Sequence, residues 1–521
     1  MLFERRLIGA SAMIAALLGI GVAGAEVRLP NALSSHAVLQ RDQPIHIWGW
    51  SDPGETVTVH FHDQTRTASA DNLGKWSLWL TPEHAGGPYT LGAQGSSSTG
   101  SGVTLSDILV GDVWVASGQS NMEMPLNGFP GSAVLKNAQQ EIAQANLPTV
   151  RLLRIEHKPS YFPENDVSAT WTECTPQTAA DFSAVAYFFG REINTREHVP
   201  IGLIDSTWGG TPVEAWTSMD RIGSDPGLMP MFASWAHFTA DLSDTDLIVA
   251  REKREDAAAE AAHQPRPDHP WHPDARSWQP TSLYNGMIAP LIPYTIKGAI
   301  WYQGETNSAP DRAPYYTRFF SAMIQDWRAK WGEGDFPFLY VQISNFYSPQ
   351  EDWGQLRDKQ RRTLAVANTA MAVTLDVGDR DNVHPADKQT VGARLALAAR
   401  AIVYGESQLE YSGPLLRTAT VEGSTMRVWF DHTRDGLAAH GPQLAGFEIA
   451  GSDRKFVPAT AKIDGSTVVV QSAGVAILNP SATRGKAGPT PTSSTRTVCP
   501  HPPSHRNQSC RSSTTTKGAP S

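Results

Sequence analysis

The stretch Val-Trp-Val-Ala-Ser-Gly-Gln-Ser-Asn-Met at residues 113–122 decides the fold that we expect for this chain. Its apolar first half, residues 113–116, is typical of a buried strand, and its polar second half contains Ser120. Open sheets of parallel strands place their ligand sites just beyond the carboxyl ends of the strands. Ser120 therefore stands where a reactive hydroxyl would lie, although a serine that only caps a helix is the plainer alternative.

The sequence on the carboxyl side of this stretch alternates between apolar strands and helical periods. We expect further strands at residues 150–155, 201–204, 298–302, 338–343 and 370–375, and helices at 182–197, 315–330 and 355–367. Such alternation indicates a parallel sheet covered by helices on both faces. The α/β domain is expected over residues 107–405. An insertion at about 218–280, rich in Ala, Glu, Asp and Pro, is expected to be partly helical.

Two regions on either side of this domain show short runs of alternating polarity, separated by turn residues. In residues 26–106 the runs at 45–50, 56–60 and 75–79 predict a small antiparallel domain that resembles a β-sandwich. A similar pattern at residues 406–480, with strands at 418–421, 426–430 and 467–470, predicts a second β-rich region.

The two ends of the chain carry signals that are not part of a fold. Arg5 and Arg6 precede an apolar run at residues 7–22, and Ala-Gly-Ala at 23–25 provides a cleavage site. We therefore expect a signal peptide at residues 1–25 and export to the periplasm or beyond the cell. Residues 481–521 are rich in Thr, Ser, Pro and Arg, which predicts a disordered tail or, alternatively, a shifted reading frame.

Composition excludes several classes of partner. A chain of 521 residues is long enough for two or three domains, and its formal net charge of −9 argues against nucleic-acid binding. No stretch beyond the short apolar run at the start could span a bilayer. We expect no metal and no cofactor, because no ligand spacing supports ligation by the cysteines or by the histidines of the insertion (Cys174, Cys499, Cys510, His263, His269 and His272).

His384 is the candidate base for Ser120. It lies between a predicted strand and a predicted helix whose apolar face repeats from Val391 to Ile402. A histidine at the same sheet edge as Ser120 could accept the hydroxyl proton and so activate the serine for attack on an acyl carbon. One nearby aspartate would fix the tautomer of the ring, and spacing favours Asp381 over Asp376 and Asp379.

Two further strand ends could supply an oxyanion hole. Gly209 and Gly210 allow a backbone N–H to approach a developing negative charge, and Gln303 offers a side-chain amide. The alternatives are a tight turn for the glycines and a buried polar contact for Gln303. We interpret Glu305 as a structural carboxylate that orders the loops.

Four blocks make a resemblance specific. Residues 118–122 (Gly-Gln-Ser-Asn-Met), 208–212 (Trp-Gly-Gly-Thr-Pro), 301–305 (Trp-Tyr-Gln-Gly-Glu) and 381–384 (Asp-Asn-Val-His) resemble, in this order, the sialate O-acetylesterase family of SGNH carbohydrate esterases. The resemblance extends from about residue 29 to residue 480. It implies a three-layer α/β/α domain of the SGNH-hydrolase type, flanked by the two β-rich regions, and deacetylation that needs no metal.

The resemblance also implies roles for single residues. Ser120 would be the nucleophile and His384 the base, and the oxyanion donors would be the Ser120 N–H, Gly209 or Gly210, and Gln303. Relatives carry an acidic residue where this chain has Asn382, so Asp379 becomes the alternative to Asp381 as the orienting acid.

The expected substrate is an acetylated carbohydrate. Four aromatic residues lie in or close to the blocks and form either sugar-facing walls or part of the core, namely Trp208, Trp216, Trp301 and Tyr302. A plant polysaccharide such as xylan or xyloglucan is the alternative to a sialate. A sialate carboxylate would require an Arg or Lys, whereas a neutral aromatic pocket would favour the plant substrates. A carbohydrate-binding protein without catalysis is the alternative of another class.

Overall fold

The computed structural model describes residues 27–485, except for residues 97–101, 130–133, 242–244, 268, 270, 271, 273, 435, 440, 476 and 477. The chain forms two compact units, the first ending at Tyr411 and the second beginning at Ser412. The predicted signal peptide, the tail beyond residue 485, and Cys499 and Cys510 lie outside the described residues.

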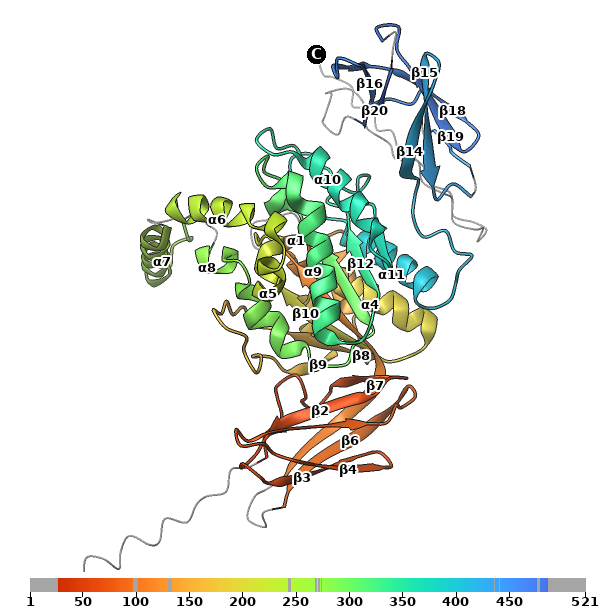
Figure 1. Ribbon diagram of the computed structural model, residues 1–521. Coiled ribbons are helices and arrows are strands. Elements are labelled where there is room, and N and C mark those ends of the chain that lie inside the picture. The colour runs from red at the N-terminus through yellow and green to blue at the C-terminus, as the bar shows by residue number, and fades with distance from the viewer. Residues whose placement is uncertain are drawn as a thin grey trace, which may run out of the picture. The chain divides into compact units, whose positions relative to one another are not determined.

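A mixed sheet of seven strands forms the centre of the first unit (Figure 1). Its order is β13-β12-β11-β7-β10-β8-β9. Neighbouring strands are parallel except for β9, which is antiparallel to β8. The strands are β7 (Val103–Gly118), β8 (Leu147–Arg154), β9 (Trp171–Cys174), β10 (Ile201–Thr207), β11 (Gly298–Tyr302), β12 (Phe338–Val341) and β13 (Thr369–Ala372). The predicted α/β class is confirmed, and the edge strand β9 is an addition to the six predicted strands.

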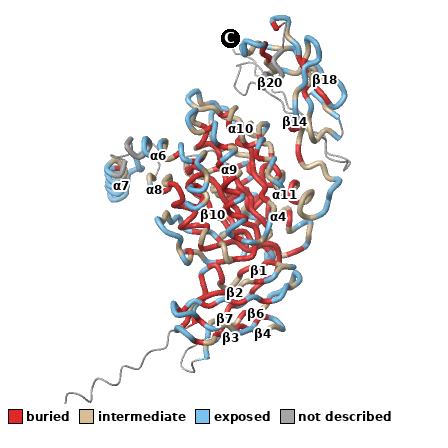
Figure 2. The backbone as a smooth tube through the Cα atoms, viewed as in Figure 1, coloured by how far each residue is buried: buried red, intermediate tan, exposed pale blue. Residues whose placement is uncertain are grey.

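Helices cover both faces of this sheet. Trp114 of β7 packs edge-on against Phe189 of α4, whereas Trp301 of β11 packs against Phe320 of α9. Trp114 pairs with Gly298 in register, and Trp301 is three residues further on, so the two tryptophans point to opposite faces. The helices that cover the sheet are α4 (Ala184–Glu197), α9 (Tyr316–Trp331), α10 (Trp353–Arg362) and α11 (Lys388–Ile402). Figure 2 shows that the buried residues concentrate in the sheet between them.

The N-terminal β-rich region shares the strand β7 with this sheet. The first half of β7 pairs with β1 (Val38–Gln40) and β6 (Gly86–Gly95), and its second half pairs with β10 and β11. The other strands of the region are β2 (Ile45–Trp50), β3 (Thr56–Phe61), β4 (Gln64–Ser69) and β5 (Lys75–Leu80). The boundary predicted between residues 106 and 107 therefore falls inside one continuous strand.

The insertion is partly helical, as its composition suggests. It contains α5 (Met219–Gly223), α6 (Pro230–Asp241), α7 (Thr245–Ala261) and α8 (Ala275–Trp278). The short helices α2 (Ala138–Ala143) and α3 (Pro176–Ala180) lie earlier in the chain. Among the residues that the structure describes, no helix is both long and apolar enough to cross a membrane.

The second unit consists of two small antiparallel sheets. One has the order β14 (Leu415–Glu422), β15 (Thr425–Asp431), β19 (Thr467–Gln471) and β18 (Thr460–Asp464). The other has the order β17 (Phe456–Pro458), β16 (Phe447–Gly451) and β20 (Leu478–Gly485). Met426, Ile449 and Val470 are among the buried residues of its core. Because β20 extends to Gly485, the β-rich region continues past its predicted end at residue 480.

Candidate active site

The turn after β7 is shaped by a close approach to β11. Gly118 has a φ of +133°, and a Cβ at this position would lie 2.2 Å from the carbonyl oxygen of Tyr302. Only glycine fits this conformation and this contact. The next residue, Gln119, donates its backbone N–H to the same carbonyl at 3.0 Å. The helix α1 (Ser120–Glu123) begins at once, so Ser120 stands at the end of the central strand.

Ser120 meets His384 at this edge of the sheet. The Oγ of Ser120 lies 2.8 Å from Nε2 of His384, although 264 residues separate them in the sequence. His384 follows β13 and precedes α11, so both residues are placed by strand ends. A neutral imidazole at this distance can accept the serine proton. The structure therefore brings the predicted nucleophile and the predicted base together.

Asn121 ties the serine turn to the histidine loop. Its side-chain nitrogen donates to Oε1 of Glu305 at 2.6 Å and to the carbonyl oxygen of Val383 at 3.0 Å. Its side-chain oxygen accepts a hydrogen bond from Nζ of Lys388, the first residue of α11. Asn121, Glu305 and Lys388 are all buried. This network joins the nucleophile turn, the histidine loop and the segment after β11, as expected of a structural carboxylate at position 305.

The surroundings of His384 favour the neutral ring. Its pKa is lowered to about 4, first because the ring is buried and second because the ammonium of Lys388 lies nearby. The carboxylate of Glu123 acts in the opposite sense. Burial in turn lowers the pKa of Lys388 to about 7, against the charges of Glu305 and Asp387. At neutral pH the imidazole can therefore serve as a base without first losing a proton.

The two aspartates that we expected to orient His384 have other partners. Asp381 is exposed and pairs with Arg380 at 3.2 Å, and Oδ1 of Asp379 accepts the backbone N–H of Asp381 at 2.9 Å. Within the described residues, neither carboxylate hydrogen-bonds with the ring of His384. The side chain of Asn382 accepts the backbone N–H of His384 at 2.9 Å. Within the described residues Ser120 thus contacts His384 without a hydrogen bond from Asp379 or Asp381 to the ring, and the orienting acid stays a prediction.

Backbone donors for an oxyanion lie on two segments. The backbone N–H groups of Ser120 and Gly210 have no acceptor among the described residues. Gly209 packs directly against the nucleophile, since a Cβ there would lie 3.2 Å from Cβ of Ser120. However, its N–H donates to Oε2 of Glu123 at 2.5 Å. Of the two predicted glycines, Gly210 is therefore the one with a free donor.

The side-chain amide of Gln303 is fully hydrogen-bonded to other residues of the protein. Its side-chain nitrogen donates to the carbonyl oxygen of Thr211 at 3.1 Å and to Oδ1 of Asn307 at 2.7 Å. Its side-chain oxygen accepts from the hydroxyl of Tyr316 at 2.8 Å. Both N–H groups are thus used inside the protein, so the buried polar contact describes Gln303 better than the oxyanion donor that we predicted.

A second acidic group lies beside Ser120 and escaped the sequence analysis. Oε1 of Glu123 lies 3.1 Å from Nε2 of His157, in addition to the bond between Oε2 and Gly209. The ring of His157 stacks on Trp208 with a centroid distance of 4.3 Å and an interplanar angle of 6°. The position of Glu123, one helical turn after Ser120, is the sequence signal that could have indicated it.

Three of the four predicted sugar-facing aromatics belong to the core. Trp216, Trp301 and Tyr302 are all 0% exposed. Trp301 packs edge-on against Trp216 and Trp327 because β11 is covered by α9. Only Trp208 is partly exposed. Phe129, which packs edge-on against the ring of His384 at 5.4 Å, is an aromatic neighbour that the sequence did not reveal.

One group of side chains has the composition of a metal site. Ligand atoms of His36, Asp107 and Glu173 lie within 4.8 Å of one another. Arg151 donates to Asp107 at 2.8 Å and approaches Glu173 to 3.9 Å, so its guanidinium already supplies the positive charge. Asp107 lies in the first half of β7, whereas Ser120 follows its end, so this group is separate from the serine site.

Cys174 is a buried free thiol. Burial raises its pKa to about 12, and its Sγ donates to the carbonyl oxygen of Ala145 at 3.7 Å. A thiol with this pKa is protonated at neutral pH and is a poor nucleophile.

Known proteins are similar to this chain in sequence and in fold. A family model described as carbohydrate esterase, sialic acid-specific acetylesterase matches residues 271–401. The sialate O-acetylesterase of Mus musculus is 31% identical over 442 residues, which cover 75% of this chain and 76% of the mouse protein. The sialate O-acetylesterase of Homo sapiens is 32% identical over 430 residues, which cover 75% of this chain and 74% of the human protein.

A solved structure adds to these similarities. The crystal structure of a carbohydrate acetylesterase from Xanthomonas citri matches with a TM-score of 0.75 and 37% sequence identity, and the match covers 89% of this chain and 94% of that one. The predicted resemblance is confirmed over most of the chain. The chain belongs to the sialate O-acetylesterase family and is a carbohydrate esterase.

Proposed function

We propose that this protein is an exported serine esterase that removes O-acetyl groups from a carbohydrate, with Ser120 as nucleophile and His384 as general base. The hydrogen bond of 2.8 Å between Oγ of Ser120 and Nε2 of His384 carries the proposal. The lowered pKa of His384 means that the ring is neutral at neutral pH and has a nitrogen free to accept the serine proton, although it is a weaker base than an ordinary imidazole.

The reaction proceeds through an acyl-enzyme. His384 takes the hydroxyl proton as Oγ of Ser120 attacks the acetyl carbonyl carbon, and a tetrahedral intermediate forms. The intermediate collapses, the bond to the sugar oxygen breaks, and His384 returns the proton to that oxygen. Water then attacks the acetyl-serine with His384 again as base, and acetate and free Ser120 are released.

The negative charge of the intermediate needs donors. The backbone N–H groups of Ser120 and Gly210 are available for this role because neither has an acceptor among the described residues. An oxyanion donor contributes about 3 kcal/mol to lowering a barrier of this kind.

The nature of the sugar is part of the proposal. The vertebrate relatives are named sialate O-acetylesterases, and the solved relative is named a carbohydrate acetylesterase. An acetylated sialate and an acetylated neutral glycan, such as xylan or xyloglucan, both present the same ester to Ser120. Residues away from the Ser-His pair must therefore distinguish these substrates.

Acetate release measured with Ser120→Ala and His384→Ala tests the catalytic assignment. We expect each variant to lose at least about a thousandfold in kcat on p-nitrophenyl acetate. An active-site phosphonate should label the wild type at Ser120 and should not label Ser120→Ala. The matched control is Ser117→Ala, which removes a buried hydroxyl that has no hydrogen-bond partner in the described part of the chain.

Each outcome of this experiment is decisive. Turnover retained by Ser120→Ala with an unchanged thermal unfolding midpoint would refute the mechanism. A wild type that binds acetylated glycans but releases no acetate would favour the non-catalytic carbohydrate-binding protein. Export is tested separately, by cell fractionation and by the N-terminal sequence of the mature protein. We expect that sequence to begin near Glu26.

A further inference from the structure

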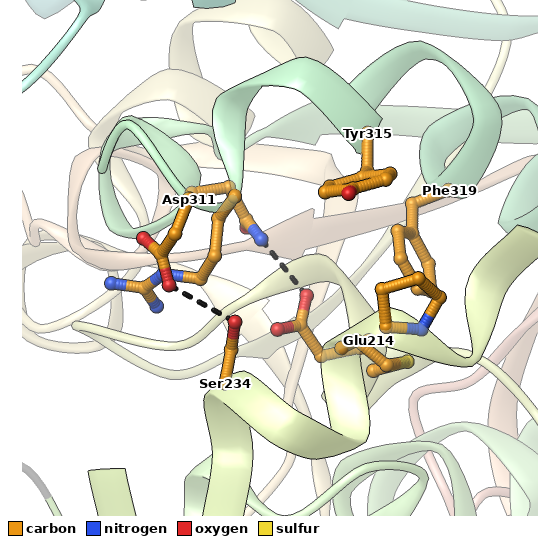
Figure 3. A pocket seen from close by; sticks show the side chains of 9 residues that line it. Glu214, Ser234, Asp311, Tyr315 and Phe319 are labelled. Carbon is orange, nitrogen blue, oxygen red and sulfur yellow. Dashed lines mark hydrogen bonds between the residues drawn. The ribbon is translucent and has the colours of Figure 1, made fainter. Parts of the chain in front are cut away.

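A cavity of about 170 Å³ lies between the sheet edge and the insertion (Figure 3). The helix α6 of the insertion contributes Met231 and Ser234 to its lining, and the start of α9 contributes Phe319. The cavity contains neither Ser120 nor His384, so the reaction described above does not account for it.

The floor of the cavity is built from the segments that follow β10 and β11. Glu214 lies in η1 (Val213–Trp216), and Asn307 lies in η5 (Glu305–Asn307). Nδ2 of Asn307 donates to Glu214 at 2.8 Å, and Oδ1 of Asn307 accepts from Gln303 at 2.7 Å. Because β10 and β11 flank β7, this floor belongs to the same edge of the sheet as Ser120.

One side of the cavity is polar and provides both donors and acceptors. Asp311 accepts a hydrogen bond of 3.0 Å from Ser234, and Figure 3 shows this pair on the same side as the Glu214 carboxylate. The guanidinium of Arg312 lies over the ring of Trp278 at 4.8 Å. Within the described residues it makes no hydrogen bond or ion pair, so its N–H groups remain available to a ligand.

The other side of the cavity is aromatic. Figure 3 shows the rings of Tyr315 and Phe319 next to each other, across from the pair of Asp311 and Ser234. Tyr315 is 40% exposed and Phe319 is buried, so the tyrosine ring is the accessible one. A ring facing hydrogen-bonding groups suits a sugar, whose C–H face packs on the ring while its hydroxyls bind the polar side.

The charges around the cavity favour a neutral sugar. Its lining holds two carboxylates, Glu214 and Asp311, against one guanidinium, Arg312. Burial raises the pKa of Glu214, while the guanidinium of Arg312 and the hydrogen bond from Asn307 act in the opposite direction. The net charge is therefore negative when Glu214 is ionised and zero when it is protonated. Neither state provides the excess positive charge that would attract the carboxylate of a sialate.

We propose that this cavity is a subsite for a neutral sugar unit of the same glycan whose acetyl group reacts at Ser120. The inference rests on the proposed function, because it assigns to the substrate a second contact at the same sheet edge. It predicts that the enzyme prefers an acetylated neutral oligosaccharide to a small acetyl ester, and that this preference depends on the cavity.

Two variants remove the contacts one at a time. Tyr315→Ala removes the aromatic surface, and Arg312→Gln removes the free guanidinium while keeping an amide. The matched control is Trp79→Ala, which removes a 54% exposed aromatic ring from β5 in the N-terminal region. Acetate release is measured with acetylated xylo-, manno- and gluco-oligosaccharides, with an acetylated sialyl trisaccharide, and with p-nitrophenyl acetate.

We expect both variants to raise KM for at least one neutral oligosaccharide by about tenfold, with kcat/KM on p-nitrophenyl acetate within about twofold of the wild type. Trp79→Ala should change neither. Binding of the unacetylated oligosaccharides to Ser120→Ala, followed by NMR, should weaken in the double variants with Tyr315→Ala or Arg312→Gln. This second measurement does not depend on turnover.

The result that overturns the subsite is an unchanged KM for every neutral oligosaccharide in both variants. An equal loss on p-nitrophenyl acetate would also overturn it, because it would show damage to the Ser-His pair. A selective loss on the sialyl trisaccharide would overturn the neutral class. Failure of the proposed function gives a different result, namely acetate release from all substrates that persists in Ser120→Ala.

Discussion

The ammonium of Lys388 donates a hydrogen bond to the side chain of Asn121, the residue that follows the nucleophile. A buried amino group that is positively charged below about pH 7 thus lies close to the Ser-His pair. This charge disfavours the imidazolium form of His384, and it is one of the two causes of the lowered pKa of the ring. The pH at which activity is lost on acidification should therefore depend on Lys388.

The first prediction concerns the acid limb of the pH profile. His384 acts as a base only when neutral, and its pKa is about 4, so kcat/KM should rise through pH 4 and stay level above it. An ordinary histidine with a pKa of about 6.5 would lose nearly all activity at pH 5. Lys388→Met removes a positive charge that lowers the pKa of His384, so the acid limb of kcat/KM in this variant should move to higher pH. A wild-type limb near pH 6.5 would contradict the assignment.

The second prediction concerns the aspartates of the histidine loop. Asp381 and Asp379 make no hydrogen bond with His384 in the described part of the chain, so Asp381→Ala and Asp379→Ala should each lower kcat/KM by less than about tenfold. An aspartate that orients a catalytic histidine contributes about 10⁴-fold. Steady-state kinetics measure kcat/KM for these variants, and the loss in His384→Ala serves as the reference. A thousandfold loss in Asp381→Ala would mean that the loop rearranges when substrate binds.

The third prediction concerns Glu123, which holds the N–H of Gly209 and pairs with His157. Glu123→Ala should lower kcat/KM by about ten- to a hundredfold, because the glycine segment loses its anchor beside Ser120. Glu123→Gln should retain more activity, since an amide oxygen still accepts from Gly209. Its acid limb should move to lower pH, because the carboxylate raises the pKa of His384. Glu156→Gln, an exposed neighbour, is the control.

The fourth prediction separates core aromatics from surface aromatics. Trp301→Ala should lower the free energy of unfolding by about 3–5 kcal/mol, because the ring is fully buried among Trp216, Phe320 and Trp327. Trp208→Ala should cost about 1 kcal/mol or less and should raise KM for an acetylated oligosaccharide. Urea unfolding and steady-state kinetics measure the two effects. Equal destabilisation by both would contradict the distinction.

Strand positions were readable from the sequence because the central strands are buried on both faces. An apolar run such as residues 298–302 has one interpretation, and the structure places β11 at those residues. The meeting of Ser120 with His384 was predictable for the same reason, since strand ends of a parallel sheet share one edge. The strand β9 was not, because its four residues lie at the sheet margin and carry no long apolar run.

The partners of polar side chains could not be read from the sequence. Gln303 follows a strand, as an oxyanion donor would, yet Thr211 and Asn307 take both of its N–H groups. Asp381 has a suitable spacing from His384, yet its carboxylate pairs with Arg380 and its backbone N–H donates to Asp379. Competition between hydrogen-bond acceptors depends on neighbours that the fold brings from other segments, and no local pattern encodes it.

The sixteen-residue strand β7 has a practical consequence for dissecting this protein. A truncation after residue 106 would not release a modular esterase, because it would cut the strand whose end holds the nucleophile. A fragment that begins at residue 107 would also lack β1 and β6, which pair with the first half of β7. The backbone N–H and C=O groups of β7 would then be unpaired and prone to pair with other chains. The N-terminal region therefore cannot be swapped between relatives as an independent domain, because the strand β7 continues from it into the catalytic sheet without a linker.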